Sequence, residues 1–293
     1  MVKKKPAKTI QGLSEHRKKF VKLLNNFNAY GYSRFNVFND FLHMAATSIA
    51  NSSDPYYLAN AKTTVDAREE EYKNVIGRYK PECQNYFGEM LAALVLEMET
   101  YCPDHWTDVL GELFIELGFS DEWKGQCFTP QSVCDMMGLI SFDVGKTQSL
   151  IDEKGFVTVN DGAVGAGAII FGAANGMRRN GFNPQKQMLA VVNDIDERCV
   201  WMCYIQLSLY GLPAIVLRQN MLTLETYDAP WYTPMFVLRA AGQSKPVECS
   251  ESLSLWKQKS LTSRNLQKQK PLTSRSRNSV SCHCFEEKFN ETV

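Results

Sequence analysis

Three apolar segments separated by two helical stretches constrain the fold of this chain more than any other feature. Residues 155–159, 188–192 and 214–217 are rich in β-branched and apolar side chains, as strands of a buried parallel sheet are. Between them, apolar residues recur at helical spacing up to about Met177 and again over 197–209. Strands that alternate with helices form a mostly parallel, doubly wound sheet with right-handed crossovers. The sequence therefore predicts an α/β fold of the Rossmann-like type.

The residues on either side of this run differ from it in composition and in apolar patterning, which predicts three regions. Residues 1–140 carry amphipathic helical patterns with little strand signal, so we expect a helical N-terminal region. Residues 141–240 hold the α/β domain. Residues 241–293 are dominated by Ser, Gln, Lys and Arg, and we expect this polar tail to be disordered because it has little apolar surface to bury. A truncated domain followed by unrelated sequence would have the same composition.

The charge balance and the cysteines limit the class of protein. The chain has 32 basic and 32 acidic residues, whereas a protein that binds DNA tightly on its own usually has a basic excess. No apolar run follows the basic N-terminus, and no segment reaches the length of a membrane span. The nine cysteines are accordingly expected to be buried thiols of a cytoplasmic protein without a membrane anchor.

A glycine-rich turn follows the first predicted strand. Its sequence from Asp161 to Ala168 places glycines at Gly162, Gly165 and Gly167, an order that differs from the dinucleotide-binding G-x-G-x-x-G motif. Such a turn lets the backbone approach a ligand closely. The Asp161 carboxylate would repel a pyrophosphate and attract the ammonium group of a methionine moiety, which favours S-adenosylmethionine over a nicotinamide cofactor. A tight turn of small residues between helix and sheet is the alternative.

Polar residues also end the second and third predicted strands. Asp194 and Asp196 follow the second strand, where a carboxylate meets ribose hydroxyls in nucleoside-binding α/β folds. We assign Asp194 to the ribose and Asp196 to the cap of the next helix, although either residue suits the cap. Asn220 follows the third strand, where it can reach an adenine amino edge or serve as an ordinary polar turn residue.

The segment Trp123-Lys-Gly-Gln-Cys-Phe-Thr-Pro130 resembles the G-Q-F-F-T-P element of the adenine-N6 DNA methyltransferases, in particular the modification subunits of type I restriction systems and their mobile-element relatives. Residues 108–117, 193–197 and 202–211 resemble the same family, so the similarity spans roughly 105–235. It implies an S-adenosylmethionine-dependent methyltransferase fold. The cofactor-binding residues that it implies are Phe128, Thr129 and Pro130 as pocket wall, Asp161, Gly165 and Gly167 at the methionine moiety, and Asp194 at the ribose.

Two features depart from the family pattern. Gly162 and Ala166 replace a proline and a small hydroxyl residue in the glycine element. The family's catalytic N/D/S-P-P-aromatic element, which binds and stacks on a flipped adenine, has only a partial counterpart. We assign Asp228, Pro230 and Trp231 to this catalytic role because they come in the right order along the chain. A surface turn with a half-buried tryptophan is the alternative.

The family resemblance leads to two functional hypotheses. The first is an enzyme that transfers a methyl group from S-adenosylmethionine to adenine N6 in DNA, with a separate specificity subunit as partner. The second is a catalytically inactive relative that acts as a binding or interaction module. A nicotinamide-dependent oxidoreductase is disfavoured by the glycine order. No metal site is predicted, because Cys282, His283 and Cys284 lack a second matching pair.

Overall fold

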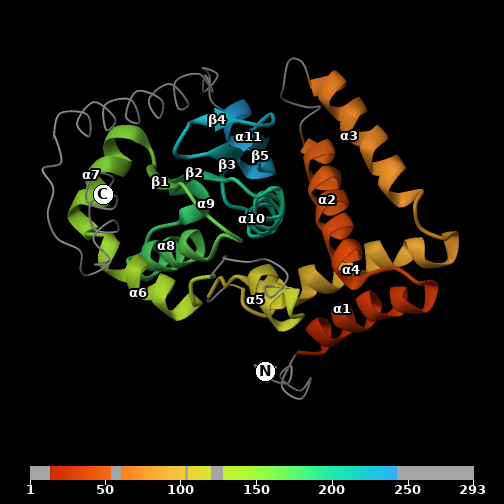
Figure 1. Ribbon diagram of the computed structural model, residues 1–293. Helices are drawn as coiled ribbons and strands as arrows, with labels where there is room; N and C mark the ends of the chain where they lie inside the picture. Colours follow the sequence, from red (N-terminus) through yellow and green to blue (C-terminus); the bar gives the residue numbers. More distant parts are fainter. Residues whose placement is uncertain (1–13, 54–60, 103–104, 120–127, 243–293) are drawn as a thin grey trace, which may run out of the picture.

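A computed structural model describes residues 14–53, 61–102, 105–119 and 128–242. Figure 1 shows a group of helices beside a unit in which helices surround a small sheet. The predicted tail and the Cys282–Cys284 cluster lie outside the described residues. Within these residues, no helix has the length and apolarity that a membrane crossing requires.

The N-terminal part is helical, as the apolar spacing predicts. Its helices are α1 (Glu15–Asn26), the 3-10 turn η1 (Phe27–Tyr30), α2 (Arg34–Ser53), α3 (Ala61–Ile76), α4 (Pro81–Glu99) and α5 (Val109–Glu116). Edge-to-face aromatic pairs fill the core of this region. Phe20, for example, lies 5.2 Å from Phe41 between ring centroids, and both rings are fully buried.

The three predicted strands form and continue a few residues past their predicted ends. The second unit contains α6 (Gln131–Ser141), α7 (Val144–Lys154), β1 (Val157–Asp161), α8 (Ala168–Arg179), α9 (Pro184–Gln187), β2 (Met188–Asp194), α10 (Glu197–Leu209), β3 (Ala214–Asn220), β4 (Glu225–Thr226), β5 (Trp231–Tyr232) and α11 (Pro234–Gly242). The strand order is β1-β2-β3-β4, and β5 also pairs with β3. β1, β2 and β3 are parallel, whereas β4 and β5 run antiparallel to β3.

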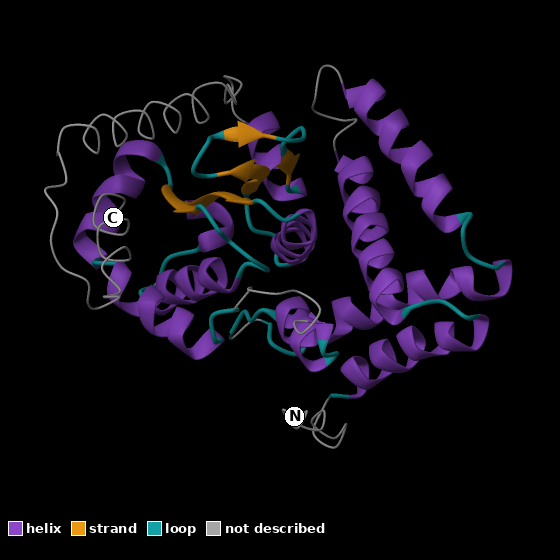
Figure 2. Cartoon of the chain, in the orientation of Figure 1, coloured by secondary structure: helices purple, strands orange, loops and turns teal. Residues whose placement is uncertain are grey.

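Helices cover both faces of this sheet, as Figure 2 shows. Val192 and Val216 point into the main core with α8 and α10, whereas Leu189 and Ile215 pack on the opposite face against Phe236 of α11. The alternation of neighbouring strand residues between two buried faces explains why the strand segments are apolar throughout. The α/β class and the mostly parallel sheet are therefore confirmed. Among the described strands, none pairs with the outer edge of β1.

The helix pair α6–α8 is packed unusually closely, and glycines make this possible. A Cβ atom at Gly138 would lie 1.9 Å from the backbone oxygen of Gly172, and one at Gly176 would lie 2.3 Å from that of Gly138. The close contact holds α6 against α8, the helix that follows the glycine turn. It thereby fixes the end of the Phe128–Pro130 segment, which leads into α6.

Candidate cofactor site at the glycine turn

The glycine turn lies at the carboxyl edge of the sheet, where parallel strands bring their ends together. Asp161 ends β1, and α8 starts directly after Gly167. Gly165 and Gly167 have φ angles of 56° and 109°, left-handed values that favour glycine. The Asp161 carboxylate accepts a hydrogen bond from the N–H of Ala163 at 3.0 Å, which holds the turn against the strand end. The N–H of Val164 donates to the backbone oxygen of Asn193 at 3.0 Å, so the turn is held at the end of β2 as well.

Asp194 connects this turn to the end of β2. Its Oδ2 accepts the N–H of Gly165 at 2.9 Å, and its Oδ1 accepts the N–H of Asp196 at 2.9 Å. The side chain is 5% exposed, and burial raises its pKa. Each carboxylate oxygen can accept a second hydrogen bond, so contact with ribose hydroxyls stays a prediction compatible with this geometry. Asp196 caps α10, accepting the N–H of Arg198, as the sequence favoured.

The aromatic residue of the 123–130 segment lies directly against the turn. A Cβ atom at Gly165 would be 3.5 Å from the Phe128 ring, which also contacts Phe114 at 5.8 Å between centroids. Thr129 and Pro130 follow Phe128, and Pro130 caps the start of α6. Phe128 is therefore placed as a wall residue would be, and the same role for Thr129 and Pro130 stays a prediction.

Met221, which directly follows β3, contacts the glycine turn and was not predicted from the sequence. A Cβ atom at Gly162 would lie 2.6 Å from Cγ of Met221, so this side chain covers the first glycine. The neighbouring Asn220 uses its Oδ1 within its own turn, accepting the N–H groups of Leu222 at 2.9 Å and Thr223 at 3.3 Å. Both of these hydrogen bonds involve the amide oxygen of Asn220 and not its amide nitrogen.

Two buried side chains below the turn were also missed from the sequence. Gln206 of α10 donates from Nε2 to the backbone oxygen of Ala166 and to Oδ1 of Asp108, both at 2.9 Å. Its Oε1 accepts the N–H of Leu110 at 3.0 Å. Burial raises the pKa of Asp108 to about 6, although hydrogen bonds from Gln206 and Gly111 oppose the shift. A helical pattern in the sequence reveals such residues only as polar positions on an apolar face.

The candidate catalytic residues lie outside this cluster. Asp228 is exposed in the turn before β5 and forms an ion pair with Arg218 at 3.1 Å. Trp231 is 9% exposed, with the Tyr204 ring at 5.2 Å and the Arg68 guanidinium 4.4 Å from its centroid. Pro230, which precedes Trp231 in the sequence, is half-buried. A base that stacked on Trp231 would have to displace one of these neighbours, so the catalytic role stays a prediction.

A cavity of about 600 Å³ lies between the helical region and the start of α10, and no residue of the glycine turn lines it. Arg78, Arg198 and Arg218 line it together with Asp40, Glu71, Asp196 and Glu197. Most of these charges are paired, for example Arg198 with Asp196 at 3.2 Å. The lining carries no excess of positive charge, so the cavity lacks the field expected of a phosphate-binding groove.

The residues at the turn suit S-adenosylmethionine better than a dinucleotide. Asp161 and Asp194 place carboxylates at the turn, and a pyrophosphate there would meet repulsion. The sulfonium and ammonium groups of S-adenosylmethionine are cations that the same carboxylates attract. The Phe128 ring, which lies against Gly165, adds an apolar surface at the turn. No group of described His, Cys, Asp or Glu residues is arranged to hold a metal ion.

The βαβαβ order and the glycine turn define a Rossmann-like α/β protein. No protein-family model and no curated protein matches the sequence. Among solved structures, the chain is similar to a protein from Listeria monocytogenes assigned as a class I S-adenosylmethionine-dependent methyltransferase, with 12% identity and a TM-score of 0.32, covering 78% of this chain and 69% of that one. It is also similar to the methyltransferase subunit of a type I restriction-modification system from Streptococcus thermophilus, with 21% identity and a TM-score of 0.33. That match covers 67% of this chain but spans only 38% of the length of the subunit.

Proposed function

We propose that this chain binds S-adenosylmethionine at the glycine turn and transfers its methyl group to adenine N6 in DNA. The observation that supports the cofactor assignment is the position of Asp194 and the Phe128 ring against Gly165, with Asp161 bonded to Ala163 of the same turn. Acidic groups favour a cationic ligand here, and the left-handed glycines let its methionine moiety approach the backbone. The choice of adenine and DNA rests on the resemblance of residues 105–235 to the adenine-N6 family.

In this function, the cofactor supplies an electrophilic methyl group on a sulfonium sulfur. The chain's residues bind and orient it: Asp161 attracts the methionine ammonium, Asp194 accepts ribose hydroxyls, and Phe128 excludes water from one side. Asp228 would accept an N–H of the target adenine, which raises the electron density on the amine nitrogen. The ion pair with Arg218 uses Oδ2 of Asp228, so its other oxygen would accept this bond.

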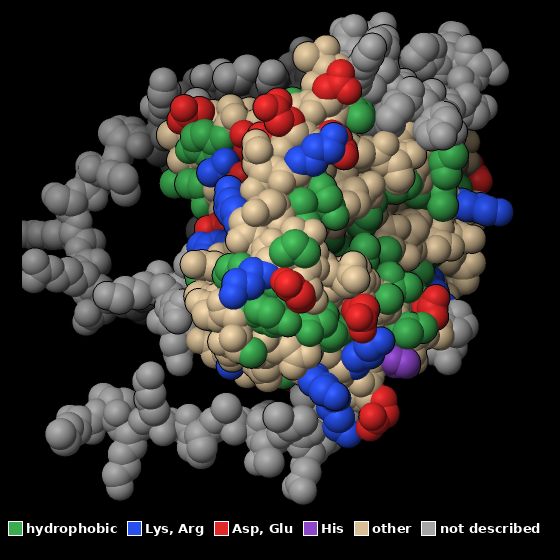
Figure 3. All heavy atoms as spheres, turned by 90° about the vertical axis from the view of Figure 1, so that its right-hand side faces the viewer, with side chains coloured by type: hydrophobic (Ala, Val, Ile, Leu, Met, Phe, Trp, Pro, Cys, Tyr) green, Lys and Arg blue, Asp and Glu red, His purple; other side chains and the backbone are tan. Residues whose placement is uncertain are grey.

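DNA and a separate specificity subunit are the partners that this proposal requires. Lys, Arg, Asp and Glu side chains are interspersed on the helical face in Figure 3, with no broad field of one sign. The whole chain is formally neutral. A protein with this charge distribution gains little affinity from phosphate contacts, so sequence-specific DNA binding would come from the partner.

A catalytically inactive binding module is the second candidate, and the surroundings of Trp231 favour it. The ring lies between Tyr204 and Arg68 rather than facing an open pocket. Such a relative would keep the cofactor site but would not transfer the methyl group.

Incubation with S-adenosylmethionine and adenine-containing duplex DNA, followed by mass spectrometry of the nucleosides, separates the two candidates. Production of N6-methyladenine that is lost in Asp228→Ala supports the enzyme. A folded protein that binds the cofactor but yields no methylated base, alone or with a specificity subunit, supports the binding module.

A further inference from the structure

Gln206 occupies a position that the proposed cofactor contacts do not explain. It is fully buried in α10, below the glycine turn, where a carboxamide is kept only if its hydrogen bonds are made. All of its bonds go to the turn or to α5: Nε2 donates to the Ala166 oxygen and to Asp108, and Oε1 accepts the N–H of Leu110. Ala166 stands between Gly165 and Gly167, which both have left-handed backbone.

The bond to Ala166 fixes the orientation of a peptide that glycines leave free to rotate. Gly165 and Gly167 have access to more backbone conformations than other residues, so the turn between them needs an external constraint. Asp194 constrains it from the β2 side through the N–H of Gly165. Gln206 constrains it from the opposite side through a carbonyl oxygen. Together they fix the N–H of Gly165 and the carbonyl oxygen of Ala166, one donor and one acceptor of the same turn.

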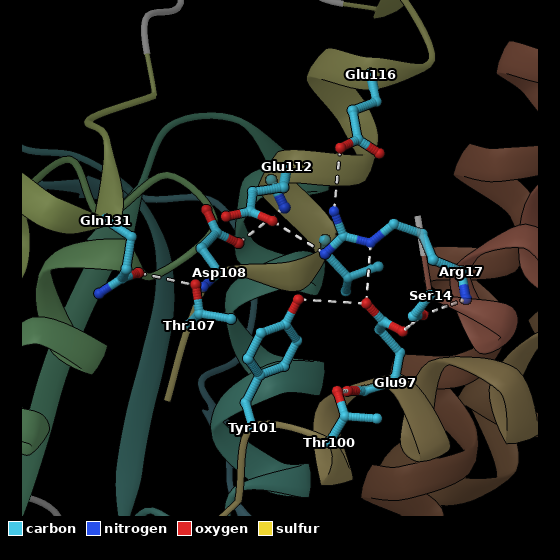
Figure 4. Close-up of polar contacts among 12 residues, drawn as sticks. Ser14, Arg17, Glu97, Thr100, Tyr101, Thr107, Asp108, Glu112, Glu116 and Gln131 are labelled. Carbon is cyan, nitrogen blue, oxygen red and sulfur yellow. Dashed lines mark hydrogen bonds and ion pairs between the residues drawn. The ribbon is translucent and has the colours of Figure 1, made fainter. Parts of the chain in front are cut away.

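Asp108 extends this constraint to the helical region. Its Oδ1 accepts both Gln206 Nε2 and the N–H of Gly111, so it caps α5 and binds Gln206 with one oxygen. In Figure 4, Glu112 and Glu116 of the same helix face Arg17 of α1. Arg17 bonds to both glutamates, at 3.0 and 3.1 Å. Helix α5 therefore connects two sets of polar contacts, the partly exposed ion pairs with α1 and the buried bonds of Asp108 and Gln206 at the glycine turn.

We propose that Gln206 is a positioning residue for the cofactor, acting through the Ala166 carbonyl, and that Asp108 couples this position to the helical region. The inference rests on the proposed function, because it assigns Gln206 to the same cofactor site. It makes α5 a structural part of that site, although no side chain of α5 needs to touch the ligand.

The test compares Gln206→Met, which keeps the volume and removes all three bonds, with Gln185→Met. Gln185 is the matched control, since its Nε2 also donates to a backbone oxygen, that of Tyr210 at 2.8 Å, which is the C-cap of α10 and lies outside the glycine turn. Calorimetry should show S-adenosylmethionine binding weakened about tenfold or more in Gln206→Met and changed less than about twofold in the control. If Gln206→Met does not fold, Gln206→Asn, which is too short to bridge Ala166 and Leu110, replaces it.

Hydrogen exchange of the ligand-free protein separates this inference from the proposed function. Without Gln206, the amide of Gly167, which donates to Val164 at 3.0 Å, should exchange at least about tenfold faster, while the control is unchanged. A wild type that fails to bind S-adenosylmethionine contradicts the proposed function only. A folded Gln206 variant with unchanged exchange at the turn overturns the positioning role, as does unchanged cofactor affinity.

Discussion

At the scale of single residues, the glycine turn is held by carboxylates that differ in burial. Asp194 and Asp161 accept N–H groups of the turn, and their negative charge would attract an incoming cation. Asp108 lies deeper, and its charge there is opposed by burial. The sequence identified Asp161 and Asp194 because they end strands. It could not identify Asp108, because nothing local indicates that Gln206, nearly a hundred residues away, binds it.

Replacing Asp108 should change how stability depends on pH. Its pKa is about 6 when folded and 3.8 ordinarily, so between those values the folded state binds more protons than the unfolded state. Its contribution to the free energy of unfolding therefore falls as pH rises from about 4 to 6, by at most about 3 kcal/mol. Asp108→Asn keeps an acceptor for Gly111 and Gln206 and should remove this fall. Urea unfolding at pH 4 and pH 7 measures it, and an identical pH dependence in both proteins would contradict the assignment.

Replacing Asp161 should affect only ligands that carry the methionine moiety. Asp161→Asn removes the negative charge while keeping the acceptor for Ala163. Loss of a charge-assisted contact should weaken S-adenosylmethionine and S-adenosylhomocysteine by about tenfold, and leave adenosine unchanged. Competition binding with the three ligands measures this. Equal weakening of adenosine would place Asp161 at the nucleoside instead.

At the scale of elements, long apolar patterns predicted most of the fold. The α1, α2, α4 and α10 patterns and the three parallel strands were recognisable because each buries a periodic or continuous apolar face. The polar α7 and the two-residue strands β4 and β5 were missed, since they have too few apolar positions to show a period. Trp231 became a catalytic candidate by its order along the chain, whereas its neighbour Arg68 comes from a distant helix.

The α6–α8 contact predicts a large effect of one added methyl group. Gly138→Ala places Cβ 1.9 Å from the Gly172 backbone oxygen, and only separation of the helices relieves this clash. We expect destabilisation of about 1–3 kcal/mol and weaker cofactor binding, because Phe128 leads into α6. Gly88→Ala in α4 is the control: its Cβ meets nothing within 4 Å, so it should stabilise by up to about 1 kcal/mol. Equal effects of the two changes on thermal unfolding would contradict this packing.

At the scale of the whole molecule, a buried arginine joins three helices of the N-terminal region. Arg17 of α1 bonds to Glu97 of α4 at 3.0 Å, besides its bonds to Glu112 and Glu116 of α5. Ser14 and Tyr101 also donate to Glu97. This cluster holds α5, and with it the cap at Asp108, against α1 and α4.

Loss of Arg17 should therefore destabilise the whole protein. Arg17→Met leaves Glu97, which is 2% exposed, as a buried charge without its partner, and should cost about 3–5 kcal/mol of unfolding free energy. Lys18→Met removes the exposed pair with Glu15 and should cost less than about 1 kcal/mol. Chemical unfolding of both variants provides the comparison. A small effect of Arg17→Met would show that the α1–α5 connection contributes little.

Calorimetric titration of the folded protein with S-adenosylmethionine tests the central claim most directly, with Asp194→Ala and Asp228→Ala in parallel. We predict micromolar binding by the wild type, loss of that binding in Asp194→Ala, and unchanged binding in Asp228→Ala, which lies outside the turn. A folded wild type that does not bind, or an Asp194 variant that binds equally well, would contradict a cofactor site at the glycine turn.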